Sequence, residues 1–157
     1  MGIGWRRARL AATEPEIRAP EARLNRRLPE DYRAFLVEHD GGEPNDNEFT
    51  IPGADNASGV NAFMSVRQIQ DELDRYGTRL PGSWIPVAYA EGGNLVLLAS
   101  DERVFFWDHE LEDRQPLFAL AADFPRFLSD LRPFDPASTE LRPGQVQERM
   151  DRPRSSA

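Results

Sequence analysis

The chain has 157 residues, which is enough for one domain with a single sizeable core. Its formal net charge is −8, which disfavours direct binding to nucleic acid, because contacts to phosphates need a basic surface. The sequence contains no cysteine, and this excludes disulfides, a thiolate nucleophile and any zinc site with Cys ligands.

No targeting or membrane-spanning segment is visible in the sequence. Arg6 and Arg7 are not followed by the apolar region of a secretion signal, and no apolar run approaches the roughly 20 residues that span a bilayer. We therefore expect a cytoplasmic protein without a membrane partner. Residues 1–13 are expected to be a flexible lead-in, 14–134 the folded domain, and 135–157, which have few apolar residues, a disordered tail.

The segment LPEDYRAFLVEHDGG, residues 28–42, predicts the first firm helix. Pro29 suits a first helical turn, and an apolar stripe follows at the spacing i, i+3, i+4 and i+7, formed by Tyr32, Phe35, Leu36 and His39. Gly41 and Gly42 are expected to end this helix, one of them in the left-handed conformation.

An earlier helix is indicated by Ile17, Glu21 and Leu24, although Pro20 would interrupt or restart it. Beyond the glycines, Phe49 and Ile51 predict a short strand and residues 60–64 another.

The middle of the chain predicts a helix and then a strand. Residues 65–68 have the form of a capping box, which opens a helix that Gly77 ends. Residues 84–90 alternate as a strand, with Pro86 at a sheet edge or a strand start.

The strongest strand signal lies at residues 95–98 and 104–107. Both runs are apolar on both faces, and the polar residues 100–103 join them, so they predict a buried hairpin at the centre of a sheet. Asp123 is expected to cap a last helix, whose apolar stripe is Phe124, Phe127, Leu128 and Leu131. This order of elements predicts an α+β fold, a single domain with a central, largely antiparallel β-sheet flanked by helices.

Asp108, His109 and Glu110 follow the hairpin and are residue types that metal and acid–base sites use. Successive side chains of a strand point to opposite faces, so the three could close on one metal only if the chain bends there. A strand end that anchors a turn is therefore the favoured role. The sequence also lacks the nucleophile-elbow, dinucleotide, P-loop and zincin motifs. We expect no enzyme activity, no cofactor and no metal.

Four segments in this order are similar to the SUKH superfamily in its Smi/Knr-type branch: LPEDYRAFLVEHDGG, IPVAYAEGGNLVLLA, VFFWDHE and ADFPRFLSDL. The resemblance covers residues 17 to 131. It implies an α+β domain that binds proteins and is not an enzyme. The bacterial members include immunity proteins against polymorphic toxins, many of them nucleases, and a fungal branch acts in cell-wall regulation.

The resemblance also implies which residues form the family's structural motifs. These are Pro29, Tyr32, Gly41, Gly42, Pro86, Gly93, Asn94, Trp107, Asp108, His109 and Glu110.

Three functions remain open on this basis. The favoured one is an immunity protein that occludes the active site of a cognate toxin domain, encoded by an adjacent gene. The alternatives are a regulatory interaction module without a toxin and, more remotely, a small metal-dependent hydrolase. For the first, acidic side chains facing a basic toxin cleft would speed association. The candidate partner-binding residues are Glu43, Asp46, Glu48, Asp55, Glu91, Glu112 and Asp113.

Overall fold

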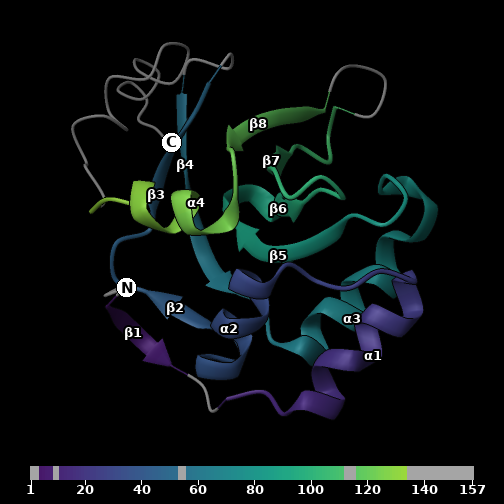
Figure 1. Cartoon of the computed structure of the whole chain (residues 1–157). Coiled ribbons are helices and arrows are strands. Elements are labelled where there is room, and N and C mark those ends of the chain that lie inside the picture. Colours follow the sequence, from purple (N-terminus) through teal and green to yellow (C-terminus); the bar gives the residue numbers. More distant parts are fainter. Residues whose placement is uncertain (1–3, 9–10, 53–55, 112–115, 134–157) are drawn as a thin grey trace, which may run out of the picture.

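The computed structural model describes residues 4–8, 11–52, 56–111 and 116–133 (Figure 1). In this part of the chain one antiparallel sheet has the strand order β1-β2-β4-β5-β6-β7-β8, and β3 pairs with β4 off this path. The strands are β1 (Trp5–Ala8), β2 (Gly42–Pro44), β3 (Glu48–Ile51), β4 (Asn56–Phe63), β5 (Ile85–Ala90), β6 (Leu95–Leu98), β7 (Val104–Trp107) and β8 (Leu117–Ala121). The predicted α+β fold is confirmed.

The described residues also form the α-helices α1 (Glu14–Leu24), α2 (Glu30–Glu38), α3 (Val66–Tyr76) and α4 (Phe124–Asp130), of which α3 packs on β5 and α4 on β8. Two short 3₁₀ turns, η1 (Gly77–Arg79) and η2 (Glu91–Gly93), follow α3 and β5. Helices α1 and α3 lie side by side, and α2 contacts both α1 and α4 (Figure 1). No helix in the described part of the chain is long and apolar enough to cross a membrane.

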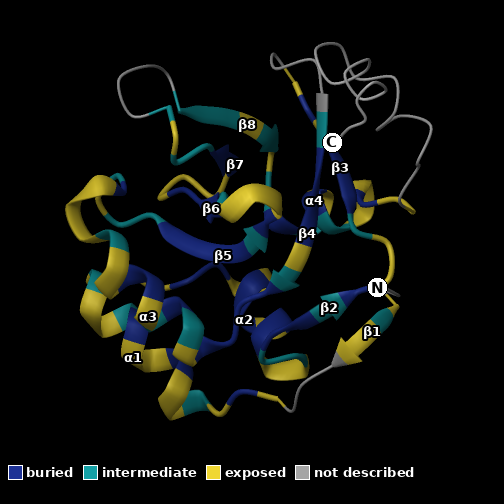
Figure 2. Ribbon diagram, turned by 180° about the vertical axis from the view of Figure 1, so that it is seen from behind, coloured by how far each residue is buried: buried dark blue, intermediate teal, exposed yellow. Residues whose placement is uncertain are grey.

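The aromatic side chains of β7 show how the layers are arranged. On one face, the rings of Phe105 and Trp107 pack against Trp84 and against Tyr76 of α3, with centroid distances of 4.8 and 5.0 Å. On the other face, Phe106 packs at 6.0 Å against Phe49 of β3. Helix α3 therefore covers one face of the sheet and β3 folds over the other. Figure 2 shows the buried central strands between these layers.

The predicted central hairpin is confirmed as β6 and β7, whose eight residues are all buried. The predicted caps are present as well. Ser65 and Gln68 form the capping box of α3, and Asp123 Oδ1 accepts a hydrogen bond from Arg126 N at 2.9 Å in α4. These elements carry strong local signals, because their apolar spacing and their caps agree with the sheet or helix that they form.

Helix α1 differs from the prediction, because Pro20 lies inside it without breaking it. Proline lacks the N–H that would bond to the carbonyl of Glu16, so the helix gives up one backbone hydrogen bond there. The ring of Pro20 is buried, and a capping box of Thr13 and Glu16 fixes the first turn. Packing and capping thus hold the helix through the proline.

Strand β1 lies within the segment for which the sequence predicts a flexible lead-in. It pairs with β2, and the Trp5 ring packs against His39 at 4.4 Å and against Phe35 at 5.9 Å. The strands β2 and β8 were also not predicted. Pro86 stands near the start of β5 as expected, but β5 is an inner strand, and a register irregularity beside Pro86 accommodates its missing N–H.

Candidate functional site

The triplet Asp108, His109 and Glu110 forms a turn directly after β7, which ends at Trp107. Asp108 Oδ1 accepts a hydrogen bond from Glu110 N at 3.1 Å, and the Asp108 carbonyl accepts one from Leu111 N at 3.1 Å. The alternation of a strand therefore does not govern these three side chains. The bend that a shared site would need is present, and the carboxylate of Asp108 is used within it to stabilise the turn.

His109 is held in place by Asn94, the residue that precedes β6. The Asn94 Oδ1 atom lies 2.7 Å from His109 Nδ1 and accepts a hydrogen bond from His109 N at 3.1 Å. Since an amide oxygen only accepts, Nδ1 carries the proton in this contact. Gly93 has φ +79°, and a Cβ built on it would lie 3.4 Å from the imidazole. The imidazole therefore links the end of β7 to the start of β6.

The side chain of Arg79 also contacts this turn. Arg79 Nη2 donates a hydrogen bond to the His109 carbonyl at 3.3 Å, and the guanidinium lies 5.3 Å from the Trp107 ring centroid and 5.5 Å from that of Tyr76. A guanidinium within about 6 Å of two aromatic rings is attracted to both by cation–π interactions. Among the residues that the structure describes, no group of three His, Asp or Glu side chains is placed to hold a metal ion.

A cavity of about 320 Å³ lies beside this turn. It opens between the β3–β4 hairpin, η2 and the end of β7, and its lining includes Ile51, Ala57, Glu91, Asn94, Asp108 and Leu111. The predicted partner-binding residues Asp55, Glu112 and Asp113 lie outside the described residues. Two of the lining residues, Ile51 and Leu111, stand at or next to the end of a described segment.

The remaining predicted acids fall in different places. Glu91 is exposed at the rim of the cavity, Glu43 is half-buried on β2, and Asp46 is exposed in the turn before β3. The Asn47 amide and the Glu91 carboxylate both approach Gly59 of β4, so the turn before β3 reaches the same region as η2. The structure therefore brings Glu91 and Asp108 to the same cavity. Asp46 precedes Asn47, whose side chain lies near Glu91 beside Gly59.

Glu48, another candidate partner-binding residue, is the first residue of β3 and is buried. Only 3% of this residue is exposed, and its carboxylate lies 3.9 Å from Arg132 Nε. Glu48 and Arg132 also exchange two backbone hydrogen bonds, of 2.9 and 3.1 Å. Glu48 therefore fastens β3 to the segment that follows α4, and its carboxylate is not available on a free surface.

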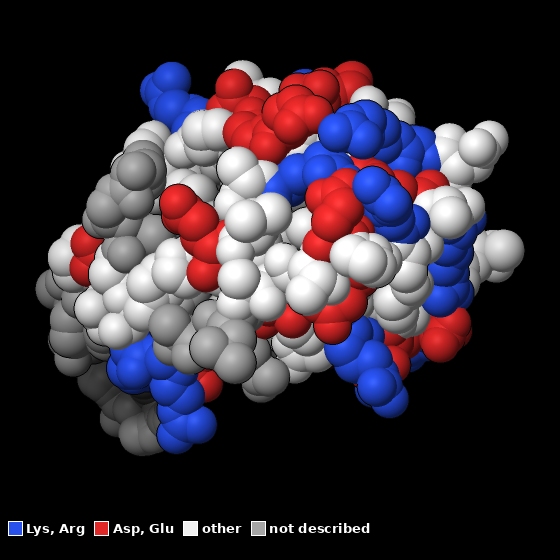
Figure 3. Space-filling model, turned by 60° about the horizontal axis from the view of Figure 1, so that its bottom comes forward, with Lys and Arg blue, Asp and Glu red and all other residues white. Residues whose placement is uncertain are grey.

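Two parts of the surface differ in whether their acidic side chains are paired with basic ones. On the side that carries α1 and α3, acidic and basic side chains are intermixed (Figure 3). The ion pairs there include Arg18–Glu14, Arg23–Asp74 and Arg67–Asp71. Glu91 and Asp108 at the cavity, and Glu110 in the turn after Asp108, form no ion pair with a described residue. The strand-end region is therefore the more negative of the two.

Comparison with protein families identifies this fold. The model of the SMI1 / KNR4 family (SUKH-1) matches residues 11–130, which is most of the chain. The chain belongs to the SMI1/KNR4 family. A curated protein, "SPbeta prophage-derived uncharacterized protein YokK" of Bacillus subtilis (strain 168), is similar as well. It is 25% identical over 142 residues, which cover 76% of this chain and 74% of that protein.

The family assignment confirms the resemblance drawn from the sequence, and the structure shows what the motif residues do in this SMI1/KNR4 domain. A Cβ on Gly41 would lie 2.8 Å from Ser65 N, and one on Gly42 would lie 2.6 Å from the Arg7 carbonyl. Both glycines have positive φ, at +91° and +142°. They are needed because the backbone of α2 turns sharply into β2 against two neighbouring chain segments.

Tyr32 of the SMI1/KNR4 domain is a packing residue. It is 1% exposed, its ring packs edge-on against Phe124 at 4.9 Å, and burial raises the pKa of its hydroxyl well above the usual value. The hydroxyl has no hydrogen-bond partner in the described part of the chain. Pro29 precedes α2 and is buried. These residues therefore shape and pack the segment that runs from α2 into β2.

Proposed function

We propose that this protein is an immunity protein that binds a cognate toxin domain and occludes its active site. The observation that carries the proposal is the strand-end region of a SUKH-family domain, where Glu91 and Asp108 line a cavity and Glu110 follows in the same turn, all three without an ion pair among the described residues. Such a region attracts a basic surface, as the substrate-binding cleft of a nuclease must be. A complex of ordinary size buries about 1,600 Å² in total, which is enough to cover an active site.

Two alternatives are less well supported. A regulatory interaction module would use the same surface to bind a partner that is not a toxin. The nature of the neighbouring gene's product distinguishes this function from immunity. A metal-dependent hydrolase is disfavoured, because no group of three His, Asp or Glu side chains in the described part of the chain is placed to hold a metal ion, and one oxygen of Asp108 caps the turn.

Co-expression with the product of the adjacent gene tests the proposal. We expect the two proteins to co-purify and the toxin activity to be suppressed at a 1:1 ratio. The association rate should fall as salt rises, while dissociation changes less, because exposed charges act on the encounter over a Debye length of about 8 Å at physiological salt.

Charge reversal locates the binding surface. The variant Glu91→Arg/Glu110→Arg should slow association about tenfold at low salt. The matched control is Asp71→Arg/Asp74→Arg on α3, where charges are intermixed, and it should change the rate far less. Equal rates for both variants would exclude the strand-end region as the binding face. A neighbouring gene product that neither binds nor is inhibited would contradict the immunity role itself.

A further inference from the structure

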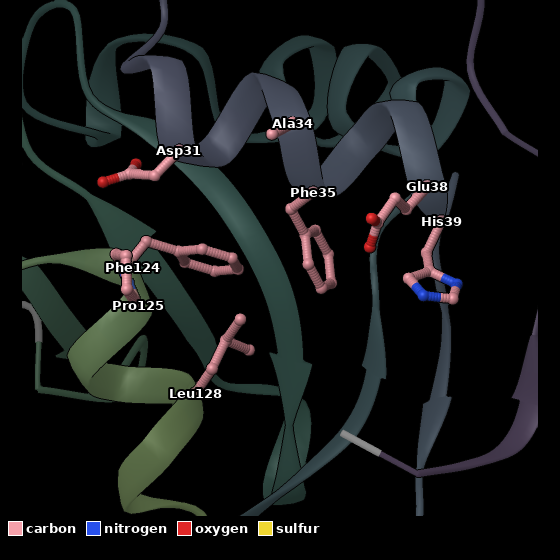
Figure 4. A pocket seen from close by; sticks show the side chains of 8 residues that line it. All are labelled: Asp31, Ala34, Phe35, Glu38, His39, Phe124, Pro125 and Leu128. Atoms are coloured by element: carbon pink, nitrogen blue, oxygen red, sulfur yellow. The ribbon is translucent and has the colours of Figure 1, made fainter. Parts of the chain in front are cut away.

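A second hollow lies between α2 and α4, away from the strand-end cavity, and has a volume of about 230 Å³ (Figure 4). Its floor is apolar and is formed by Phe35, Phe124 and Leu128. Asp31 and Glu38 stand one at each end of the α2 side. We call this hollow the α2–α4 groove.

The groove exists because of the side chains that the two helices bring together. Phe124 fills the space between Tyr32 and Phe35, at 4.9 Å from each ring. Ala34, which lies between these two residues in α2 and also lines the hollow, is exposed and too short to reach α4. Leu128 is therefore only partly covered, and an apolar surface remains open to water. Covering such surface is favourable by about 25 cal/mol for each Å².

The charge at the groove is negative and uncompensated. Asp31 and Glu38 are exposed and form no ion pair within the described residues, and no Arg lines the groove. Both arginines of the two helices are engaged elsewhere. Arg33 pairs with Glu14 and Glu21 on the side of α1, and Arg126 pairs with Asp130.

We propose that the α2–α4 groove binds a segment of a partner protein that inserts one apolar side chain between two basic residues. Asp31 and Glu38 are seven residues apart on one helix face, which places their backbones about 10 Å apart. The two basic residues should have the same spacing. The groove is smaller than the about 300–1,000 Å³ of small-molecule sites, so it suits a single side chain of a protein better than a metabolite.

This proposal rests on the groove alone and does not require that the partner be a toxin. Its failure would leave the immunity role and the strand-end surface untouched. Conversely, a protein without a toxin partner could still bind such a segment here.

Titration of the full-length protein with synthetic helical peptides tests the proposal. The probe peptide carries two Arg placed seven residues apart and a Leu four residues after the first Arg, and two matched peptides replace either the Leu by Ser or both Arg by Glu. Backbone amide shifts in the NMR spectrum are the readout. We expect the probe to shift amides of α2 and α4, and both matched peptides to bind at least fivefold more weakly.

Variants of the protein localise the effect. Asp31→Asn/Glu38→Gln should weaken the probe at least fivefold, and Ala34→Leu, which fills the groove from an exposed helical position, should do the same. The control Glu30→Gln removes one charge from α2 outside the groove and should leave binding unchanged. Equal binding of all three peptides, shifts confined to other surfaces, or no shift at millimolar peptide would each overturn the proposal.

Two other occupants give distinct results. If the chain's own C-terminal segment fills the groove, the full-length variant Arg149→Gln/Arg152→Gln/Arg154→Gln will bind the probe at least fivefold more tightly than the unaltered protein. If a second copy fills it, sedimentation will show a dimer that Ala34→Leu dissociates. Either result would overturn the assignment to a partner protein.

Discussion

At the scale of single residues, Arg33 shows how a charged side chain can be buried in a small domain. Its side chain is 8% exposed and lies 2.8 Å from Glu21 and 2.7 Å from Glu14, so it joins α2 to α1. Removing one partner of a buried pair leaves the other charge without compensation. We expect Arg33→Met to lower the free energy of unfolding by about 3 kcal/mol, measured by urea denaturation. Arg27→Met, whose partner Glu30 is exposed, should cost well under 1 kcal/mol.

The ion pair of Arg33 with Glu21 should also make the stability of the protein depend on pH. The Arg33 guanidinium holds the pKa of Glu21 below its usual value, against the opposing effect of burial. The unfolded chain therefore binds more protons between that lowered pKa and about 4.3, so the stability that Glu21 contributes is present above this window and is lost as pH falls through it. The decline should be shallower in Arg33→Met. Parallel pH profiles for the two proteins would show that the pair does not carry the effect.

At the scale of elements, sequence and structure agree where local and tertiary preferences coincide. Helices α2, α3 and α4 have periodic apolar stripes, and the hairpin β6–β7 is apolar on both faces. The strands β1, β2 and β8 were missed for physical reasons. β1 contains two arginines, β2 has only three residues and ends in a proline, and β8 is only partly buried. Pairing with neighbouring strands makes them strands, and a local pattern cannot show that.

Strand β1 should contribute to stability. Trp5 packs on Phe35, His39 and Phe63. Trp5→Ala is expected to lower the free energy of unfolding by about 2–3 kcal/mol, less than for a fully buried tryptophan, because this ring is only partly covered. Denaturant unfolding of Trp5→Ala beside Arg6→Ala, an exposed neighbour in the same strand, measures this. A cost for Trp5→Ala no larger than that of the control would mean that residues 4–8 act as a loose lead-in after all.

At the scale of the whole molecule, the sequence identifies single residues of the candidate surfaces but does not show which of them lie close together in space. It identified Glu91 and the Asp108 turn as separate features, and the sheet brings both to one cavity. It could not identify the α2–α4 groove, because the lining residues come from two helices about 90 residues apart. The burial of Glu48 could not be predicted either, because its partner Arg132 is equally distant in the chain.

The tail remains a prediction. Residues 137–157 have few apolar side chains, so they have little to bury. A chain that ends at Phe134 should keep its midpoint of thermal unfolding, followed by circular dichroism, within a few degrees of the full-length value. A decrease of more than about 8 °C would correspond to more than 1 kcal/mol and would show that the tail packs on the domain.

The order of strands in the sheet has a consequence for how the protein acquires its binding surfaces. Neighbours in the sheet are mostly neighbours in the chain, and the hairpin β6–β7 closes over residues 99–103 alone. Such local pairings form early, because little loop entropy opposes them, whereas contacts between distant segments form late. The meeting of α2 and α4 belongs to the second kind. A partner that binds the α2–α4 groove would therefore distinguish folded molecules from partly folded ones, because it would bind only a chain in which α4 has docked on α2.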